Sequence, residues 1–338
     1  MNLLKKAYYR ACSVFPPSLI QRISPVKTLL PYHHLVSDKE LLHIKHLYSY
    51  KNTNQFKKDI DYLLKYFKPA TVDELVDGIN KKRSLPSGTF LLTFDDGFKE
   101  VYEVIAPILF SRKVPAIFFI NPAFIDNKEL FYRCKISLLI EELSKRNNAL
   151  EIASEIMEQP FGDFQQLKVQ LKKITQLNKF ILDAIADSIN YSFSDYMETE
   201  KPFMTTGQIE ELSKNGFVIG SHSWDHPYYE FLSAEEQVSQ TIQSMKFVKD
   251  STKVKYDCFS FPHTDAVVTQ DFFDRMNREP VKPDILFGIQ NQKMEVKNRM
   301  LHRFNAERPE VTMRSQVNGI LLYSLMQKAL GRNTIQRI

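Results

Sequence analysis

Residues 90–97 read Phe-Leu-Leu-Thr-Phe-Asp-Asp-Gly. The first five are typical of a short buried strand, which would end where the two carboxylates begin. Gly97 allows the chain to turn sharply there. Adjacent carboxylates repel each other unless a cation separates their roles, so one could bind a metal while the other stays free as a base. The alternative is a surface turn, because Asp-Asp-Gly is ordinary turn chemistry.

Strands and helices alternate on both sides of this stretch. Such alternation is typical of an α/β fold with parallel strands joined by crossover helices. The sequence predicts strands over 28–34, 90–94, 116–120, 217–220, 258–261, 286–289 and 303–305, and helices over 55–67, 102–110, 206–214 and 317–330.

The alternation breaks between residues 137 and about 190, where apolar and charged residues recur at helical spacing. The segment is too long for a loop in a compact domain. We therefore predict a helical insertion, at about 137–200, beside the mouth of the fold. The expected division is an N-terminal extension over 1–27 and one catalytic domain over 28–338.

Composition favours a soluble globular protein, since 43% of the 338 residues are apolar and 25% are charged. A net charge of +5 fits a mild attraction to anionic surfaces or glycans and does not argue for nucleic acid. Cys12, Cys134 and Cys258 lie too far apart for a zinc knuckle, and their odd number does not suggest a disulfide framework. They suit a reducing compartment.

The first 24 residues contain no continuous apolar stretch of the secretory type. No later run reaches the ~18 apolar residues of a membrane span. We therefore expect a cytoplasmic protein. Lys5, Lys6 and Arg10 could belong to a short basic amphipathic helix that contacts a membrane surface, or to a helix packed on the domain.

A second polar cluster, residues 220–227, follows the predicted strand at 217–220. It contains His222 and His226, and two histidines four residues apart can face one way on a helical turn and chelate a metal. The alternative for either residue alone is a core or surface histidine.

A third cluster, Pro-Tyr-His-His-Leu-Val-Ser-Asp at 31–38, ends the first predicted strand. Histidine is the natural general acid near neutral pH. The alternative is chance, because the chain has eight histidines. His43 and His46 lie nearby on a segment with no predicted structure.

Together these clusters resemble the polysaccharide deacetylases of the NodB-homology type, carbohydrate esterase family 4. TFDDG at 93–97 is similar to the first motif of that family, and SHSWDH at 221–226 to the second. The resemblance covers about 28–305. It implies a distorted (β/α)7 barrel and a divalent metal ion, with zinc first and cobalt or nickel as alternatives. It also implies that Asp95 is the general base and that Asp96, His222 and His226 bind the metal.

The chain departs from the family pattern in two places. Residues 259–263 match the third motif without its arginine, and the late Leu-x-His motif of the general acid is not evident. Some members instead carry the acid on an N-terminal Tyr-His-x-Val segment, which residues 33–36 resemble. The resemblance therefore implies His34 as the acid, with His33 as the alternative. It also suggests that Arg303 holds Asp95, and that His263 supplies a backbone N–H to the oxyanion; we expect both Arg303 and His263 in the substrate-binding part of the site.

These roles predict a hydrolase that removes N-acetyl, or O-acetyl, groups from a glycan or a lipid-linked sugar. Neither nucleic acid nor a protein partner is expected. Two alternatives stay open: hydrolysis of a non-carbohydrate C–N bond on the same fold, and an inactive glycan-binding protein. The complete Asp-Asp-His-His set argues against loss of activity, because an inactive site has no need of metal ligands.

Overall fold

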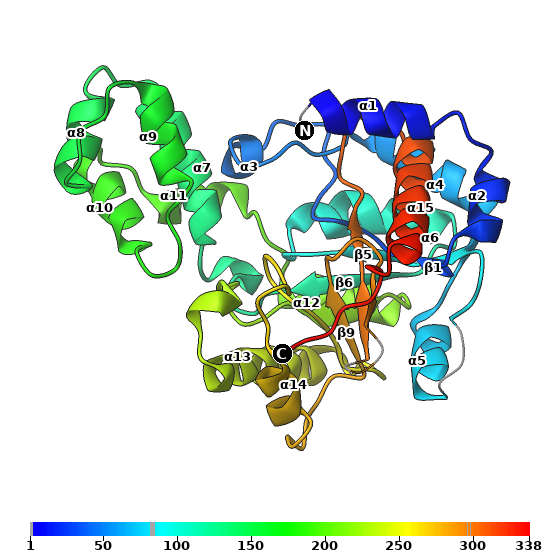
Figure 1. Cartoon of the computed structure of the whole chain (residues 1–338). Coiled ribbons are helices and arrows are strands. Elements are labelled where there is room, and N and C mark those ends of the chain that lie inside the picture. The colour runs from blue at the N-terminus through cyan, green and yellow to red at the C-terminus, as the bar shows by residue number, and fades with distance from the viewer. Residues whose placement is uncertain (1–2, 82–84, 296, 298) are drawn as a thin grey trace.

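Nine short strands form one curled sheet at the centre of the molecule (Figure 1). The computed structural model describes residues 3–81, 85–295, 297 and 299–338. Every pairing in this sheet is parallel except that of β10 with β11. In sheet order the strands are β10 (Met294–Glu295), β11 (Met300–His302), β9 (Ile285–Gly288), β8 (Cys258–Ser260), β7 (Val218–Ser221), β6 (Ala116–Ile120), β5 (Leu92–Phe94), β2 (Pro31–His33) and β12 (Phe304–Asn305).

The central strands are apolar because helices and loops cover both faces of the sheet. All five residues of β6 are buried, as are all three of β5, which is usual for parallel sheets. A smaller parallel sheet extends the fold at the other ends of these strands, in the order β1 (Thr28–Leu29), β4 (Thr89–Phe90) and β3 (Lys68–Pro69).

The sheet closes on itself at Arg303. This residue alone separates β11 from β12, yet β12 forms one edge of the sheet and β11 lies next to β10, which forms the other edge. The Arg303 N–H donates to Gly288 O on β9 (2.8 Å), whereas the next N–H, of Phe304, donates to Leu30 O beside β2 (3.0 Å). The closed, mainly parallel sheet confirms the predicted distorted α/β barrel.

Helices surround the barrel and pack on its apolar core. Several begin with reciprocal capping boxes; in α4, for example, Asn52 and Gln55 each accept the other's backbone N–H. The helices and helical turns around the barrel, with or without such a cap, are α3 (Leu42–Lys45), α4 (Thr53–Tyr66), α5 (Val72–Asn80), η1 (Val101–Ile105), α6 (Ala106–Ser111), η2 (Ile125–Asn127), α12 (Thr206–Lys214), η3 (Tyr229–Phe231), α13 (Ala234–Thr252), α14 (Gln270–Met276) and α15 (Met313–Ala329).

Five helices follow one another between β6 and β7 and form a lobe at one side of the barrel, green in Figure 1. They have an apolar core of their own, which also includes residues of α3. The lobe begins at Tyr132, earlier than the expected residue 137, because the apolar core positions of its first helix start there. The helices are α7 (Tyr132–Leu143), α8 (Ala149–Ile156), α9 (Phe164–Leu171), α10 (Phe180–Ser188) and α11 (Phe193–Glu200).

The N-terminal segment forms α1 (Leu3–Cys12) and α2 (Pro17–Ile23), which pack against α15. The Tyr8 hydroxyl donates to Gly319 O (2.7 Å), and the Asn318 amide donates to Cys12 O and Phe15 O (3.0 Å each). Residues 1 and 2 of the expected extension lie outside the described part of the chain. Within that part, none of the helices is long and apolar enough to cross a membrane.

Several details differ from the sequence predictions. The strands expected over 28–34 and 90–94 are each two strands in different sheets, and the helix expected over 102–110 begins with the π turn η1. Helices α5, α13 and α14 were not predicted. The sequence also gave no signal for β10 and β11, because they are short and interspersed with charged residues. The three cysteines are free and buried.

Candidate active site

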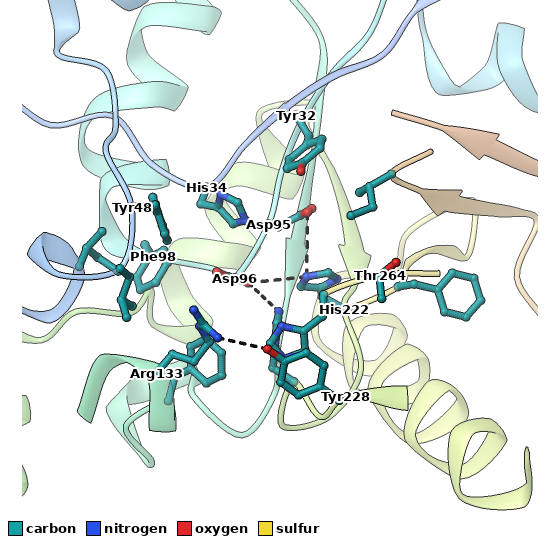
Figure 2. Close-up of a pocket in the computed structure, with 17 residues that line it drawn as sticks. Tyr32, His34, Tyr48, Asp95, Asp96, Phe98, Arg133, His222, Tyr228 and Thr264 are labelled. Carbon is teal, nitrogen blue, oxygen red and sulfur yellow. Dashed lines mark hydrogen bonds and ion pairs between the residues drawn. The ribbon is translucent and has the colours of Figure 1, made fainter. Parts of the chain in front are cut away.

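The polar clusters of the sequence meet at the C-terminal ends of the barrel strands. There they line a cavity of about 380 Å³ (Figure 2). Asp95 and Asp96 follow β5, His34 follows β2, His222 follows β7, and His263 lies three residues beyond β8. Because parallel strands all end at the same edge of a sheet, motifs far apart in the sequence come together here.

Asp96, His222 and His226 form a group that could hold a metal ion. One ligand atom from each lies within 4.8 Å of the others. Asp96 Oδ1 is 3.2 Å from His226 Nε2 and 3.6 Å from His222 Nε2. This oxygen is buried and has no hydrogen-bond partner among the described residues. A buried carboxylate oxygen without a donor is costly unless a cation faces it, so the residues fit a metal.

The other ring nitrogens orient the two histidines toward that position. His222 Nδ1 donates to Ser260 O (2.7 Å), which leaves a lone pair on Nε2. His226 Nδ1 lies 3.1 Å from His263 Nε2 and can donate to it. Burial lowers the pKa of His222 to about 4, so its ring is neutral at pH 7 and able to bind a metal.

His226 reaches this position from a loop, so the expected helical turn is wrong. Residues 222–228 contain no helix, and Ser223 and His226 have φ of +66° and +58°. The buried Asn121 amide donates to the carbonyl oxygens of His222 and Ser223 and holds the loop. These two left-handed residues bend the loop so that both imidazoles face Asp96.

Asp95 is held by Arg303 and is not part of the metal group, as we call Asp96, His222 and His226. The guanidinium donates to both carboxylate oxygens, at 2.7 and 2.8 Å, and also to Thr93 Oγ1 (3.0 Å) and Ser260 Oγ (2.5 Å). Burial, the largest single influence, raises the pKa of Asp95, but Arg303 together with His222 and His34 outweighs it and keeps the pKa below its ordinary value. Arg303 is fully buried and does not line the cavity. The expectation that it belongs to the substrate-binding surface is therefore wrong.

The structure brings His34, and not His33, to the cavity. His34 Nδ1 lies 2.7 Å from Glu307 Oε2, and Glu307 Oε1 accepts the backbone N–H groups of His34 and Leu35. His33 is buried against Phe94, and neither of its ring nitrogens has a hydrogen-bond partner in the described structure. Glu307 was missed in the sequence, although a carboxylate two residues after a predicted strand end is a usable signal.

Glu307 sets the protonation of His34. Burial by itself lowers the pKa of His34, but the carboxylate of Glu307, with help from Asp95 and Asp96, raises it to about 9. The imidazole is therefore protonated at neutral pH, with Nδ1 bonded to Glu307.

His263 lies in the cavity wall with φ of +53°. Its ring stacks on Tyr228, with centroids 3.6 Å apart and planes 5° from parallel. No group in the described structure accepts its backbone N–H, which stays available as the predicted oxyanion donor. Tyr48, Arg133 and Tyr228, which also line the cavity, were not predicted from the sequence.

The remaining candidate histidines serve other contacts. His43 bonds to the Tyr196 hydroxyl and His46 to Glu141, at 2.8 Å each, between α3 and the helical lobe. His302 belongs to a second buried group that could in principle hold a metal.

This second group, Asp265, Glu295 and His302, already contains a cation. Arg337 Nη2 lies 2.8 Å from Asp265 Oδ2 and 2.8 Å from Glu295 Oε2. The guanidinium therefore occupies the position of an ion and neutralises both carboxylates.

Known proteins resemble this chain in sequence and in fold. The sequence model of a family described as polysaccharide deacetylase matches residues 82–278, more than half of the chain. The matched range includes Asp95, Asp96, His222 and His226 but neither His34 nor Arg303. No curated protein sequence matches significantly.

Solved structures show the same fold over nearly their whole length. The Streptococcus pyogenes deacetylase PplD in complex with acetate has 12% identity and a TM-score of 0.57, covering 88% of this chain and 99% of its own. IcaB from Ammonifex degensii has 15% identity and a TM-score of 0.53, covering 89% and 98%. A de-N-acetylase from Aggregatibacter actinomycetemcomitans has 16% identity and a TM-score of 0.51, covering 85% and 96%.

Proposed function

Because the chain belongs to the polysaccharide deacetylase family, we propose that it is a metal-dependent hydrolase that removes N-acetyl groups from a glycan or a lipid-linked sugar. One observation carries the proposal. The buried group of Asp96, His222 and His226 lies beside an ionised Asp95 and a protonated His34 in a single cavity.

The three ligand residues suit zinc, with cobalt or nickel as alternatives. Two imidazoles and one carboxylate form a common catalytic zinc set that leaves a coordination position open. Such an ion, when bound, polarises a carbonyl oxygen and lowers the pKa of water.

Asp95 and His34 have the protonation states that amide hydrolysis requires. Arg303 keeps Asp95 ionised and fixed, so this carboxylate accepts a proton from the attacking water. His34 is protonated and supplies a proton to the nitrogen of the sugar, which cannot leave as an anion. The backbone N–H of His263 donates to the oxygen on which negative charge develops.

Two variants test this division of roles. Asp95→Asn should keep metal affinity near that of the wild type, because the ligands are intact, and should lower turnover by roughly two to four orders of magnitude. Asp96→Asn should weaken metal binding, so its activity should recover in part at high metal concentration. The exposed Asp271 provides a matched control, since Asp271→Asn should change neither property.

The measurement is metal titration beside acetate release from a panel of N-acetylated glycans and sugars. Loss of the metal in Asp95→Asn with retention in Asp96→Asn would reverse the two roles. Full activity in both variants, or no acetate release by the metal-loaded wild type from any member of the panel, would refute the proposal.

A further inference from the structure

Arg133 brings a positive charge from the helical lobe into the catalytic cavity. It lies on the first turn of α7 and lines the cavity beside Tyr228, as Figure 2 shows. Its Nη1 donates to the Tyr228 hydroxyl at 3.2 Å. No carboxylate pairs with it in the described part of the chain, although a partly buried guanidinium loses solvation and normally gains an anion in return.

Nearby charges do not supply that anion. Arg303 pairs with Asp95, and Asp96 faces the two imidazoles of the candidate metal site, so neither carboxylate pairs with Arg133. Lys135, two residues along the same helix, is paired, since its Nζ lies 2.6 Å from Asp183 Oδ1. Arg133 therefore differs from Lys135 in that it faces the cavity and has no carboxylate partner in the described part of the chain.

Two lysines add to this charge from a second element. Lys168 lies on α9 and Lys172 one turn further, both partly buried and without a carboxylate partner in the described structure. Burial, followed by repulsion from Lys168 and Arg133, lowers the pKa of Lys172. Shortly after, Gln176 donates to Tyr228 O (3.1 Å), which connects this segment to the cavity wall. Because α9 packs against α7, which carries Arg133, the two lysines add positive charge on the same side of the lobe.

The contacts also place the anion relative to the reaction. His226 of the metal group contacts His263 (3.1 Å), His263 stacks on Tyr228, and Tyr228 accepts from Arg133. A continuous series of contacts therefore leads from the candidate metal ligands past two aromatic rings to the guanidinium. The planar fork of arginine matches the two oxygens of a carboxylate or phosphate.

We propose that Arg133, with Lys168 and Lys172 beyond it, binds an acidic group of the carbohydrate substrate, a carboxylate or a phosphate on or next to the acetylated sugar. This inference rests on the proposed deacetylase function. It narrows the substrate class from any acetylated glycan to an acidic one.

Two matched substrate pairs test the proposal and separate the two acids. One pair is an oligosaccharide of alternating N-acetylglucosamine and glucuronate, and the same oligosaccharide with its carboxyl groups reduced to alcohols. The other is N-acetylglucosamine 1-phosphate and the methyl glycoside of N-acetylglucosamine. For each compound, acetate release gives kcat and KM, and calorimetry gives Kd. The proteins are the metal-loaded wild type, Arg133→Gln, Arg133→Lys and the control Lys135→Gln.

The acidic member of at least one pair should be preferred by about ten- to a hundredfold in kcat/KM, mainly through KM, as for a hydrogen bond between charged groups. Arg133→Gln should bring the ratio close to one, Arg133→Lys should keep part of it, and Lys135→Gln should keep all of it. The preference should also fall as salt is added. The pair that shows the preference identifies the acid.

The Kd values test the anion site, and acetate release tests the deacetylase function, so the two claims can fail separately. Equal Kd for both members of each pair, or a preference that Arg133→Gln retains, would overturn the anion site while acetate release left the deacetylase function intact. Conversely, Arg133-dependent binding of an acidic member without release of acetate from any compound would support the anion site and count against the deacetylase function.

Discussion

Replacing Arg303 with methionine should damage both the stability and the chemistry of this protein. The side chain makes two charge-assisted hydrogen bonds to Asp95 in a fully buried environment. Removing one partner of a buried ion pair leaves the other charge uncompensated, at a cost of about 3–5 kcal/mol. That is a large part of the roughly 5–15 kcal/mol by which a domain is stable.

The effect on Asp95 has a definite sign. With Arg303, the pKa of Asp95 lies below its ordinary value, and this contributes stability above pH ~4 that is lost as the pH falls through the folded pKa. In Arg303→Met, burial is the larger remaining influence, so the pKa should rise. The carboxylate would then be protonated, and inactive as a base, at pH values where the wild type works. Arg303→Lys keeps the positive charge but cannot make the bidentate hydrogen bonds of arginine. The pKa of Asp95 in this variant should therefore lie between its values in the wild type and in Arg303→Met.

Urea denaturation, metal content and the pH dependence of acetate release measure these effects. Arg303→Met should still bind metal but should be less stable than the wild type. The acidic limb of its pH–rate profile should move to higher pH. Arg275→Met, which removes an exposed arginine paired with Asp271, is the control and should change stability by less than about 0.5 kcal/mol. If Arg303→Met had the urea midpoint of the wild type and the same acidic limb in its pH–rate profile, the ionisation of Asp95 would not depend on Arg303.

Three further predictions concern other parts of the structure. Glu307→Gln should lower the pKa of His34 from about 9 and move the alkaline limb of the pH–rate profile down by about one to three pH units; an unmoved limb would remove His34 as the acid. Chelation of the metal should abolish acetate release and lower the thermal midpoint, and added zinc should restore both; activity that survives verified removal of the metal would contradict the mechanism. Asp59→Asn should leave Lys51 buried without its partner and cost about 3–5 kcal/mol in urea denaturation, whereas Asp77→Asn in the exposed pair with Lys81 should cost little; equal losses would show that burial is irrelevant.

Sequence patterns predicted the parts of the site that lie next to strong local signals. The apolar strand before Asp95, the glycine after Asp96 and the strand before His222 are each visible within a few residues. Since parallel strands share one carboxyl edge, their order was enough to predict that the metal group and the base would meet.

The missed features depend on contacts between distant segments. Glu307 reaches His34 only because β12 pairs with β2, and the strand predicted over 303–305 does not by itself specify this pairing between opposite ends of the chain. Arg133 enters the cavity because of how the helical lobe packs beside the barrel, which helical spacing alone cannot specify. The loop to His226 depends on two left-handed residues that are neither glycine nor asparagine.

The closure of the sheet at Arg303 also bears on when the enzyme becomes competent during folding. The metal group comes from loops that follow strands β5 and β7 in the middle of the sheet, whereas Arg303 reaches Asp95 from the junction between its first and last edges. Contacts between residues so distant in the chain, such as Leu30 with Phe304, require the closure of a long loop and tend to form slowly. An unclosed barrel could thus bring together the proposed metal ligands while Asp95, the proposed base, is not yet held by Arg303. Metal binding would then be detected at an early stage of folding, whereas turnover would be detected only after the barrel has closed.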